Sequence, residues 1–233
     1  MDDVGTRLAT TFADVARALL SDNDLDSVLN RIAAVAVEEV GGCESAGIDL
    51  IEKQVVRCVA WTSETARQMG EIQNEAGEGP CLSAIREHET FRSDDLEHED
   101  RWPQFAQRAR TEMDVRSMLG FRLFAEEDTM GALNLHSSKP DAFDDRALAI
   151  GSILAAHAGI AMSWAREREY MATALENRDV IGQAKGLLMA QRNVDADGAF
   201  ALLRAASQRL NIKLIQVAER LTDPAGPGIA FDE

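Results

Sequence analysis

The feature that most constrains this fold is a helical pattern that runs without a proline from Asp144 to about Arg192. A helix this long extends beyond one compact domain, so we expect it to join two parts of the chain and to pair with a second copy as a coiled coil. An alternative is two helices with a break in "REREY", residues 166–170. The apolar seam of this pattern comprises Leu148, Ile150, Leu154, Ala158, Ala161, Ala165 and Leu175, with Arg168 beside it.

Short elements of both kinds precede this helix. Apolar residues at helical spacing predict helices over 8–19 and 25–40, and Pro103 suits the first turn of another. Between the strands, Leu133 and Leu135 alternate with Asn134 and His136. The fold class is therefore α+β, a mixed sandwich with an antiparallel sheet and helices on its faces. The predicted strands are 44–51, 54–61, 117–125 and 129–137, with a possible further one in 90–96.

The residues after the long helix predict a small helical unit. Asp195 and Asn211 are each expected to cap the start of a short helix, which gives three helices with the end of the long one. The last residues, "DPAGPGIAFDE", are rich in Pro and Gly, and we expect them to be disordered. The predicted domains are thus 1–160 and 161–223, with a tail at 224–233.

Net charge separates the same two parts. The chain carries −16 overall, which by itself argues against nucleic acid, because phosphate binding depends on Lys and Arg. Residues 1–171, however, hold 17 Lys and Arg against 32 Asp and Glu, whereas residues 172–223 hold 7 against 6. Any anionic partner is therefore expected at the C-terminal unit.

Three widely spaced cysteines support neither a disulfide framework nor a zinc site, so no metal is predicted. The N-terminus has no basic and apolar signal pattern, and no uninterrupted apolar run reaches the ~18–20 residues of a membrane span. We expect a cytoplasmic protein without a membrane partner.

The segment "DVIGQAKGLLMAQRNVD", residues 179–195, has two faces. Ile181, Ala184, Leu187 and Leu188 repeat at helical spacing as a core face, while a second, largely polar face is formed by Arg178, Gly182, Lys185, Met189 and Arg192. Each of Gly182 and Gly186 costs roughly 0.5–1 kcal/mol relative to alanine within a helix. Either a closely packed neighbouring helix or a ligand lying on the helix backbone is needed to explain them.

Residues 168–223 resemble the ANTAR domain, the RNA-binding module of bacterial transcription antiterminators. The resemblance rests on the Arg of "LENR", on "IGQAKGLLM", on "AFALLRAASQ" and on the close "N-x-K-L-x-x-VA". The upstream part resembles a GAF domain, a sensor of small molecules or signals, through its strand and helix order, "EGPC" and "GALNLHS". The order GAF then ANTAR is typical of actinobacterial regulators. Such proteins, by resemblance, are dimers that hold paired RNA hairpins with short loops and prevent a terminator from forming.

The resemblance implies an RNA-binding face on the C-terminal unit. Glycines there would let a phosphate or a loop base approach the helix closely, while Arg and Lys supply charge. Phe200 is assigned to the core by its spacing, which favours recognition of a structured loop over stacking on an aromatic platform. Met189 is expected to pack at the core or its edge. The predicted RNA-binding residues are Arg178, Gly182, Gln183, Lys185, Gly186, Arg192, Ser207, Gln208, Arg209 and Lys213.

The sensor half offers fewer signals. Trp61, Cys81, Trp102 and Phe121 are candidates for a ligand pocket, although large aromatic residues in such a sandwich are more often core. Cys81 follows Gly-Pro at a helix start, where the helix dipole lowers the pKa of a thiol, so a redox role competes with simple burial. No cofactor is predicted, and an unknown small-molecule ligand remains open. His136 and His157 are lone histidines, better explained as surface or capped residues than as haem ligands.

These observations predict a non-enzymatic, signal-responsive RNA-binding antiterminator. No Ser/His/Asp arrangement, phosphate-binding glycine loop or metal cluster is found in the sequence. The alternative is a DNA-binding transcription factor with a ligand-sensing domain, since short C-terminal helices can form a helix-turn-helix. DNA is the less favoured partner, because "NIKLIQVAER" offers only Lys213, Gln216 and Arg220 for base contacts.

Overall fold

The fold is described from a computed structural model of the chain, which covers residues 24–52, 55–87, 90–125 and 128–223, together with residues 10, 13 and 17. The predicted helix over 8–19 and the predicted tail fall mostly or wholly outside the described residues. The chain divides into two compact units, Met1–Ala165 and Arg166–Glu233. This division lies five residues after the boundary expected from the sequence.

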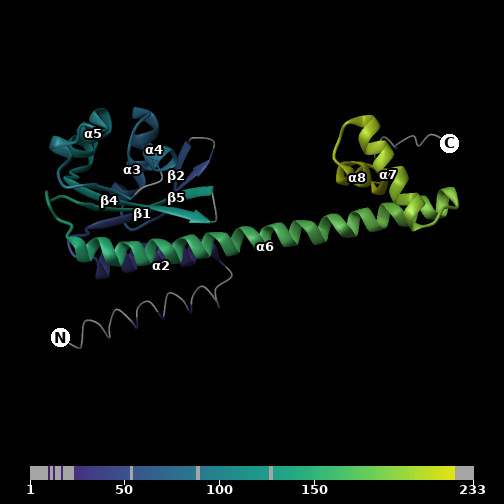
Figure 1. Cartoon of the computed structure of the whole chain (residues 1–233), viewed down its shortest axis with the longest axis horizontal. Coiled ribbons are helices and arrows are strands. Elements are labelled where there is room, and N and C mark those ends of the chain that lie inside the picture. The colour runs from purple at the N-terminus through teal and green to yellow at the C-terminus, as the bar shows by residue number, and fades with distance from the viewer. Residues whose placement is uncertain are drawn as a thin grey trace. The chain divides into compact units, whose positions relative to one another are not determined.

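A five-stranded antiparallel sheet forms the middle layer of the first unit (Figure 1), with strand order β2-β1-β5-β4-β3. The two predicted strand pairs are both present, and each is antiparallel. The strands are β1 (Ser45–Glu52), β2 (Val55–Trp61), β3 (Phe91–Ser93), β4 (Ser117–Ala125) and β5 (Asp128–Ser137).

Helices cover both faces of this sheet, as Figure 1 shows. On one face, Leu133 and Leu135 of β5 pack with α2 and the first part of α6. On the other face, Met118 and Ala132 pack beneath α3, α4 and α5. Both sides of each central strand are therefore buried, so the polar positions that alternate along β5 also lie inside the protein. The helices are α2 (Leu25–Glu39), α3 (Glu64–Ala76), α4 (Pro80–Glu87), α5 (Pro103–Met113) and α6 (Asp145–Arg192), with a 3₁₀ turn at Leu96–His98.

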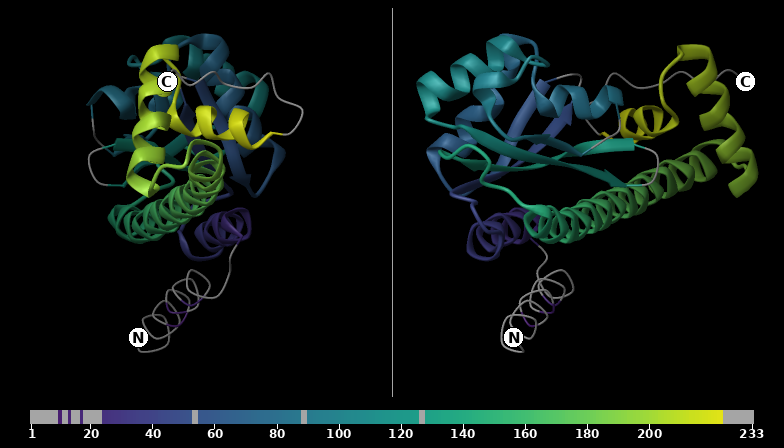
Figure 2. Two further views of the ribbon diagram at one scale, coloured as in Figure 1. Left: turned by 90° about the vertical axis from the view of Figure 1, so that its right-hand side faces the viewer. Right: turned by 60° about the vertical axis from the view of Figure 1, so that its left-hand side comes forward.

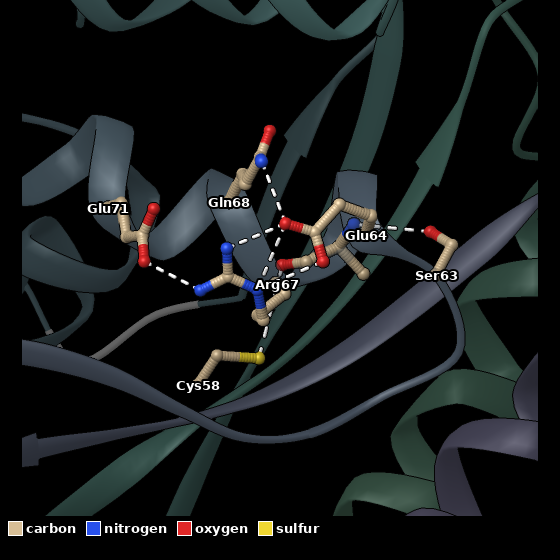
Figure 3. A network of polar contacts seen from close by, with 7 residues as sticks. Cys58, Ser63, Glu64, Arg67, Gln68 and Glu71 are labelled. Atoms are coloured by element: carbon tan, nitrogen blue, oxygen red, sulfur yellow. Dashed lines mark hydrogen bonds and ion pairs between the residues drawn. The ribbon is translucent and has the colours of Figure 1, made fainter.

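Helix α3 was not predicted from the sequence, although its ends carry recognisable signals. The Ser63 hydroxyl accepts a hydrogen bond from the Ala66 N–H at the N-terminus, and Gly77 adopts φ 68° at the C-terminus. On its exposed side, Arg67 pairs with Glu64 and Glu71 one turn to either side (Figure 3). These surface pairs support the helix locally and contribute little to overall stability.

Helix α6 is one continuous helix of 48 residues, so the prediction of a long helix is confirmed and the alternative with a break is wrong. The face assigned to the coiled coil is also wrong: Ile150, Leu154, Ala158 and Ala161 are buried in the core of the first unit. The apolar side chains that are exposed along α6 share only Leu175 with the predicted seam, and they are spaced seven and four residues apart. This exposed stripe comprises Ile153, Ile160, Trp164, Met171 and Leu175.

The same helix contains an 18-residue window with a mean hydropathy of 1.5, which meets the length and composition of a membrane span. Half of that window is buried inside the structure. The buried half belongs to the core contacts of α6 in the first unit.

The second unit is a small helical bundle made by the end of α6, α7 (Ala196–Leu210) and α8 (Leu214–Thr222), shown in Figure 2. Asp195 caps α7 as predicted, because its carboxylate accepts the Gly198 N–H at 2.8 Å. Asn211 does not start α8; it ends α7 with φ 51°, a left-handed conformation that Asn tolerates. The core of the second unit is entirely apolar among the described residues. It comprises Ala184, Leu188, Ala199, Leu203, Ala206, Val217 and Ala218.

Leu187, predicted to face this core, is instead 39% exposed, as is Met189. Ala184 and Leu188, four residues apart, are the fully buried residues of α6 in this core, and Ile181 packs against it partly buried, as predicted. Two short helices are too few to cover a wider stripe of α6, so its neighbouring apolar positions remain at the surface.

Candidate nucleic-acid interface and sensor site

A shallow groove of about 540 Å³ lies between α6 and α7 in the second unit. Six positions of α6 form most of it, and Phe200 of α7 closes one side. Three of the predicted RNA-binding residues meet here, namely Arg178, Gly182 and Lys185. The complete lining is Ala174, Asn177, Arg178, Ile181, Gly182, Lys185 and Phe200.

The groove is a cationic site on an acidic protein. Two of its seven lining residues are cations and none is acidic, whereas the whole chain carries −16. Neither Arg178 nor Lys185 belongs to any ion pair found among the described residues. The Lys185 ammonium lies 5.8 Å from the centre of the Phe200 ring, within reach of a cation–π interaction. These charges are therefore available to an anion.

The two glycines of this helix face open space. A Cβ atom added to Gly182 or to Gly186 would have no neighbouring atom within 4 Å. Tight packing of helices within the chain, the alternative reading of these glycines, is therefore wrong for both positions. Gly182 lies on the groove surface, and its missing side chain leaves the backbone of α6 open to an approaching molecule.

Phe200 was wrongly assigned to the core; its side chain is 41% exposed. The buried positions of α7 are Ala199, Leu203 and Ala206, and Phe200 is displaced by about 100° around the helix from this row. Helical phase could have revealed this, because Ala199, Leu203 and Ala206 already form an inward row at helical spacing. Asn177, half-buried in the groove, was missed as well.

The remaining predicted RNA-binding residues lie outside the groove. Ser207 donates its hydroxyl hydrogen to the Ile212 carbonyl at 2.6 Å, which ties the end of α7 to the following turn. Arg204, exposed and four residues after Phe200, continues the same face of α7 and was not predicted. The other six are exposed at scattered places: Gln183, Gly186, Arg192, Gln208, Arg209 and Lys213.

In the first unit, the four predicted pocket residues do not come together. Trp61 is 44% exposed at the end of β2. Phe121 belongs to the core beneath α2 and α6, whereas Trp102 and Cys81 belong to two separate apolar clusters on the opposite face of the sheet. Trp102 also donates its indole hydrogen to the Ser83 hydroxyl at 2.8 Å, a structural role. The pocket prediction is corrected accordingly.

Besides its apolar neighbours, Cys81 has a set of buried polar contacts, to Asp49, Gln73 and Asn134. Its thiol donates to Asp49 Oδ2 at 3.3 Å, and its backbone N–H donates to Gln73 Oε1 at 2.8 Å. The Asn134 amide donates to the same Asp49 oxygen at 2.8 Å and lies 3.0 Å from the Cys81 sulfur. Asp49 Oδ1 and Asn134 Oδ1 have no hydrogen-bond partner among the described residues. The sequence had singled out only Cys81 from this group.

Burial governs the titration of this cluster. It raises the pKa of Asp49 to about 6, against the opposing effect of hydrogen bonds from its neighbours. Burial, together with the nearby Asp49 charge, also raises the pKa of the Cys81 thiol well above its usual value. The predicted lowering by the helix dipole is therefore outweighed, and Cys81 lacks the thiolate character of a reactive cysteine.

His136 and His157 are both structural. His136 is buried in β5, not at the surface as expected, and burial lowers its pKa to about 4. Its Nδ1 lies 3.5 Å from the Ser45 hydroxyl. His157 is bound through Nδ1 to the Ile153 carbonyl at 2.8 Å. No group of three or more potential metal ligands is found in the described part of the chain.

Solved structures similar to this chain show the same sandwich. The GAF domain of a phosphoenolpyruvate-protein phosphotransferase from Coxiella burnetii has a TM-score of 0.57 and 15% identity, and the match covers 70% of this chain and 96% of that one. The GAF domain of the Acinetobacter phosphotransferase gives 0.54 and 14%, over 70% and 98%. Free methionine-R-sulfoxide reductase from Neisseria meningitidis gives 0.55 and 16%, over 69% and 91%. At such identities the likeness concerns the fold alone. No curated protein matches the chain.

Two family models match along the chain, in the order expected from its motifs. A GAF domain matches residues 22–163, which correspond to the sheet unit, and an ANTAR domain matches residues 169–221, which correspond to the helical unit. The GAF match alone spans more than half of the 233 residues. The chain therefore belongs to the GAF family and carries an ANTAR domain after its GAF domain, the arrangement of a signal-responsive regulator.

Proposed function

We propose that this protein is a cytoplasmic, non-enzymatic regulator that binds RNA hairpins through its ANTAR unit and thereby prevents terminator formation. The observation that carries the proposal is the cationic groove over Gly182, on a chain that is otherwise strongly acidic. Arg178 supplies a planar, forked donor and Lys185 a compact charge, the two side-chain chemistries that bind phosphate oxygens. The GAF unit receives a small-molecule signal, and no cofactor takes part.

The exposed stripe of α6 supports a homodimer. Ile153, Ile160 and Trp164 are 43–48% exposed, and Met171 and Leu175 are more so. Their alternating steps of seven and four residues repeat every eleven residues, which keeps a stripe on one side of a nearly straight helix. A second copy of α6 covers such a stripe, and two ANTAR units in one dimer can hold two hairpins.

The first test measures RNA binding by the full chain and by its Lys185→Ala variant. Lys185 contacts the exposed ring of Phe200 and is absent from the apolar core, so its removal deletes charge without opening a cavity. We expect weaker binding to hairpin RNA and a salt dependence that is flatter by roughly 0.7–0.9 units of log–log slope, the loss of one phosphate contact.

Arg220→Ala is the matched control, since Arg220 is an exposed cation of the same unit outside the groove. Its affinity should stay close to that of the parent. Equal losses for both variants would mean that only overall charge matters, and stronger binding of duplex DNA than of hairpin RNA would favour a DNA-binding regulator.

The dimer is tested by light scattering on Trp164→Glu. A carboxylate in the middle of the stripe should separate the dimer, because a charge buried between two apolar helices is strongly unfavourable. Trp61→Glu serves as the control, since Trp61 is similarly exposed, 44% against 48%, but lies at the end of β2. A monomeric parent, or a dimeric Trp164→Glu variant, contradicts pairing through this stripe.

A further inference from the structure

We propose that the groove between α6 and α7 is a nucleobase subsite, in which one unpaired base of an RNA loop stacks on Phe200. The inference deepens the proposed function and rests on it. The groove has a volume of about 540 Å³, within the ~300–1,000 Å³ of ordinary small-ligand pockets. The ligand class is a flat aromatic ring joined to a phosphate.

Phe200 is the feature that requires an explanation. It is the only aromatic residue between positions 172 and 223, and it is placed at the surface although the unit has an apolar core in which to bury it. Ala199 takes the inward position beside it. An exposed ring beside a groove provides a face on which any base can stack, and such stacking accounts for much of the affinity of single-stranded RNA sites.

The floor of the groove allows a base to reach this ring. A side chain at position 182 would project into unfilled space, because a Cβ there meets no atom within 4 Å. Glycine keeps that space free for the base, at the cost in helix stability already noted. The half-buried Asn177 amide, in the same groove, offers one donor group and one acceptor for the edge of the base.

Charge favours an anionic ligand at this surface. Arg178 and Lys185 line the groove without any acidic residue, so an anion is favoured beside the aromatic face. A base with its phosphate joins these two chemistries in one ligand, with the ring on Phe200 and the phosphate near the two cations.

The experiment uses the full chain and RNA hairpins that share one stem and carry a randomised short loop. A hairpin selected by the parent protein is then labelled with 2-aminopurine at each loop position in turn. The variants are Phe200→Leu, which keeps an apolar side chain but removes the aromatic face, and Phe200→Tyr, which keeps that face. Leu210→Ala is the control, because Leu210 is also 41% exposed on α7 but lies outside the groove.

We expect fluorescence at one loop position to fall when the parent or Phe200→Tyr binds, and to remain high with Phe200→Leu. The affinity of Phe200→Leu should drop by roughly 5- to 150-fold with an unchanged salt slope, since stacking involves no charge. Leu210→Ala should bind like the parent. These results together support the subsite.

Three outcomes overturn the subsite, and they are distinguishable. If a selected hairpin binds Phe200→Leu as well as it binds the parent, the subsite is wrong while RNA binding stands. If Phe200→Leu changes the oligomeric state of the protein, the groove is an interface between copies. If no hairpin is selected at all, the proposed function itself fails and the subsite with it.

Discussion

One helix carries glycines with opposite roles in the two units. At Gly151, in the GAF unit, an added Cβ would lie 2.3 Å from the ring of the buried Phe121. At Gly182 and Gly186, in the ANTAR unit, it would meet nothing within 4 Å. The fold requires the first glycine and does not require the other two. A glycine that costs helix stability and relieves no clash is best explained by a molecule outside the chain.

The two units also differ in where their polar side chains lie. Every buried polar residue of the described chain lies in the GAF unit, among them Asp49, Asn134 and His136, whereas the buried residues of the ANTAR unit are all apolar. The GAF unit thus keeps its polar chemistry inside, where burial shifts pKa values, while the ANTAR unit presents its polar side chains at the surface. The two units therefore differ in chemistry, with titratable groups buried inside the first and charged side chains exposed on the second.

The largest predicted change in stability tests the glycines that the GAF unit requires, and we expect it at Gly131 of β5. An alanine Cβ there would lie 1.9 Å from the Asp49 carbonyl oxygen on the neighbouring strand, and backbone cannot yield as a side chain can. Gly131→Ala should lose about 3 kcal/mol or more of unfolding free energy, at or above the usual range for overpacking, as measured by urea unfolding. Gly41→Ala, with no atom near its Cβ, is the control and should unfold like the parent. A parental transition for Gly131→Ala would show that β1 and β5 separate easily.

The next effect concerns pH. The pKa of His136 is lowered to about 4 in the fold, so its stabilising contribution is lost as pH falls from 6.5 toward 4. The pKa of Asp49 is raised to about 6, so its contribution is lost as pH rises from 3.8 toward 6. Each shift corresponds to roughly 3 kcal/mol, and the two oppose each other between pH 4 and 6.

Asp49→Asn removes the opposing contribution of Asp49 and leaves that of His136. The unfolding free energy of this variant should rise steeply from pH 4 to 6.5, while that of the parent changes little. His136→Gln should show the reverse slope between pH 4 and 6. Urea unfolding at a series of pH values measures both. If Asp49→Asn follows the parent curve throughout, Asp49 does not titrate in this range.

We expect the smallest change in stability from Gly182→Ala. This variant is also the most informative about function, because its stability and its RNA affinity should change in opposite directions. The ANTAR unit should gain about 0.5–1 kcal/mol, because alanine favours the helix and its methyl group meets no atom. RNA affinity should fall at the same time, since that methyl group enters the groove. Gly186→Ala, outside the groove, should gain the same stability with a smaller loss of binding. Both quantities come from thermal unfolding and RNA titration of the same samples, and a more stable Gly182→Ala that binds RNA fully would mean that the groove is not used.

Local pattern was enough to predict most elements of the fold. Strand alternation located β1, β2, β4 and β5, and the absence of proline over 48 residues predicted α6 as one helix. Asp195 could be assigned as a cap because an N-cap depends only on the next three residues. Helix α3 was missed, since its buried residues include polar Gln73 and the small Gly70, which leave a weak apolar pattern.

The sequence by itself thus determined the two-part organisation, the α+β class, the long helix and three of the six α6 residues of the groove, because all of these depend on periodicity and composition along the chain. Only the tertiary structure decided which face of α6 is buried, that Phe200 is exposed, and that Asp49, Gln73, Cys81 and Asn134 form one cluster. The physical reason is that periodicity shows a residue to be apolar or polar, whereas burial depends on which other elements come to cover that face. Helix α6 is apolar on more than one side, and the helix and strands that cover its first part, α2, β1 and β2, lie far away in the sequence.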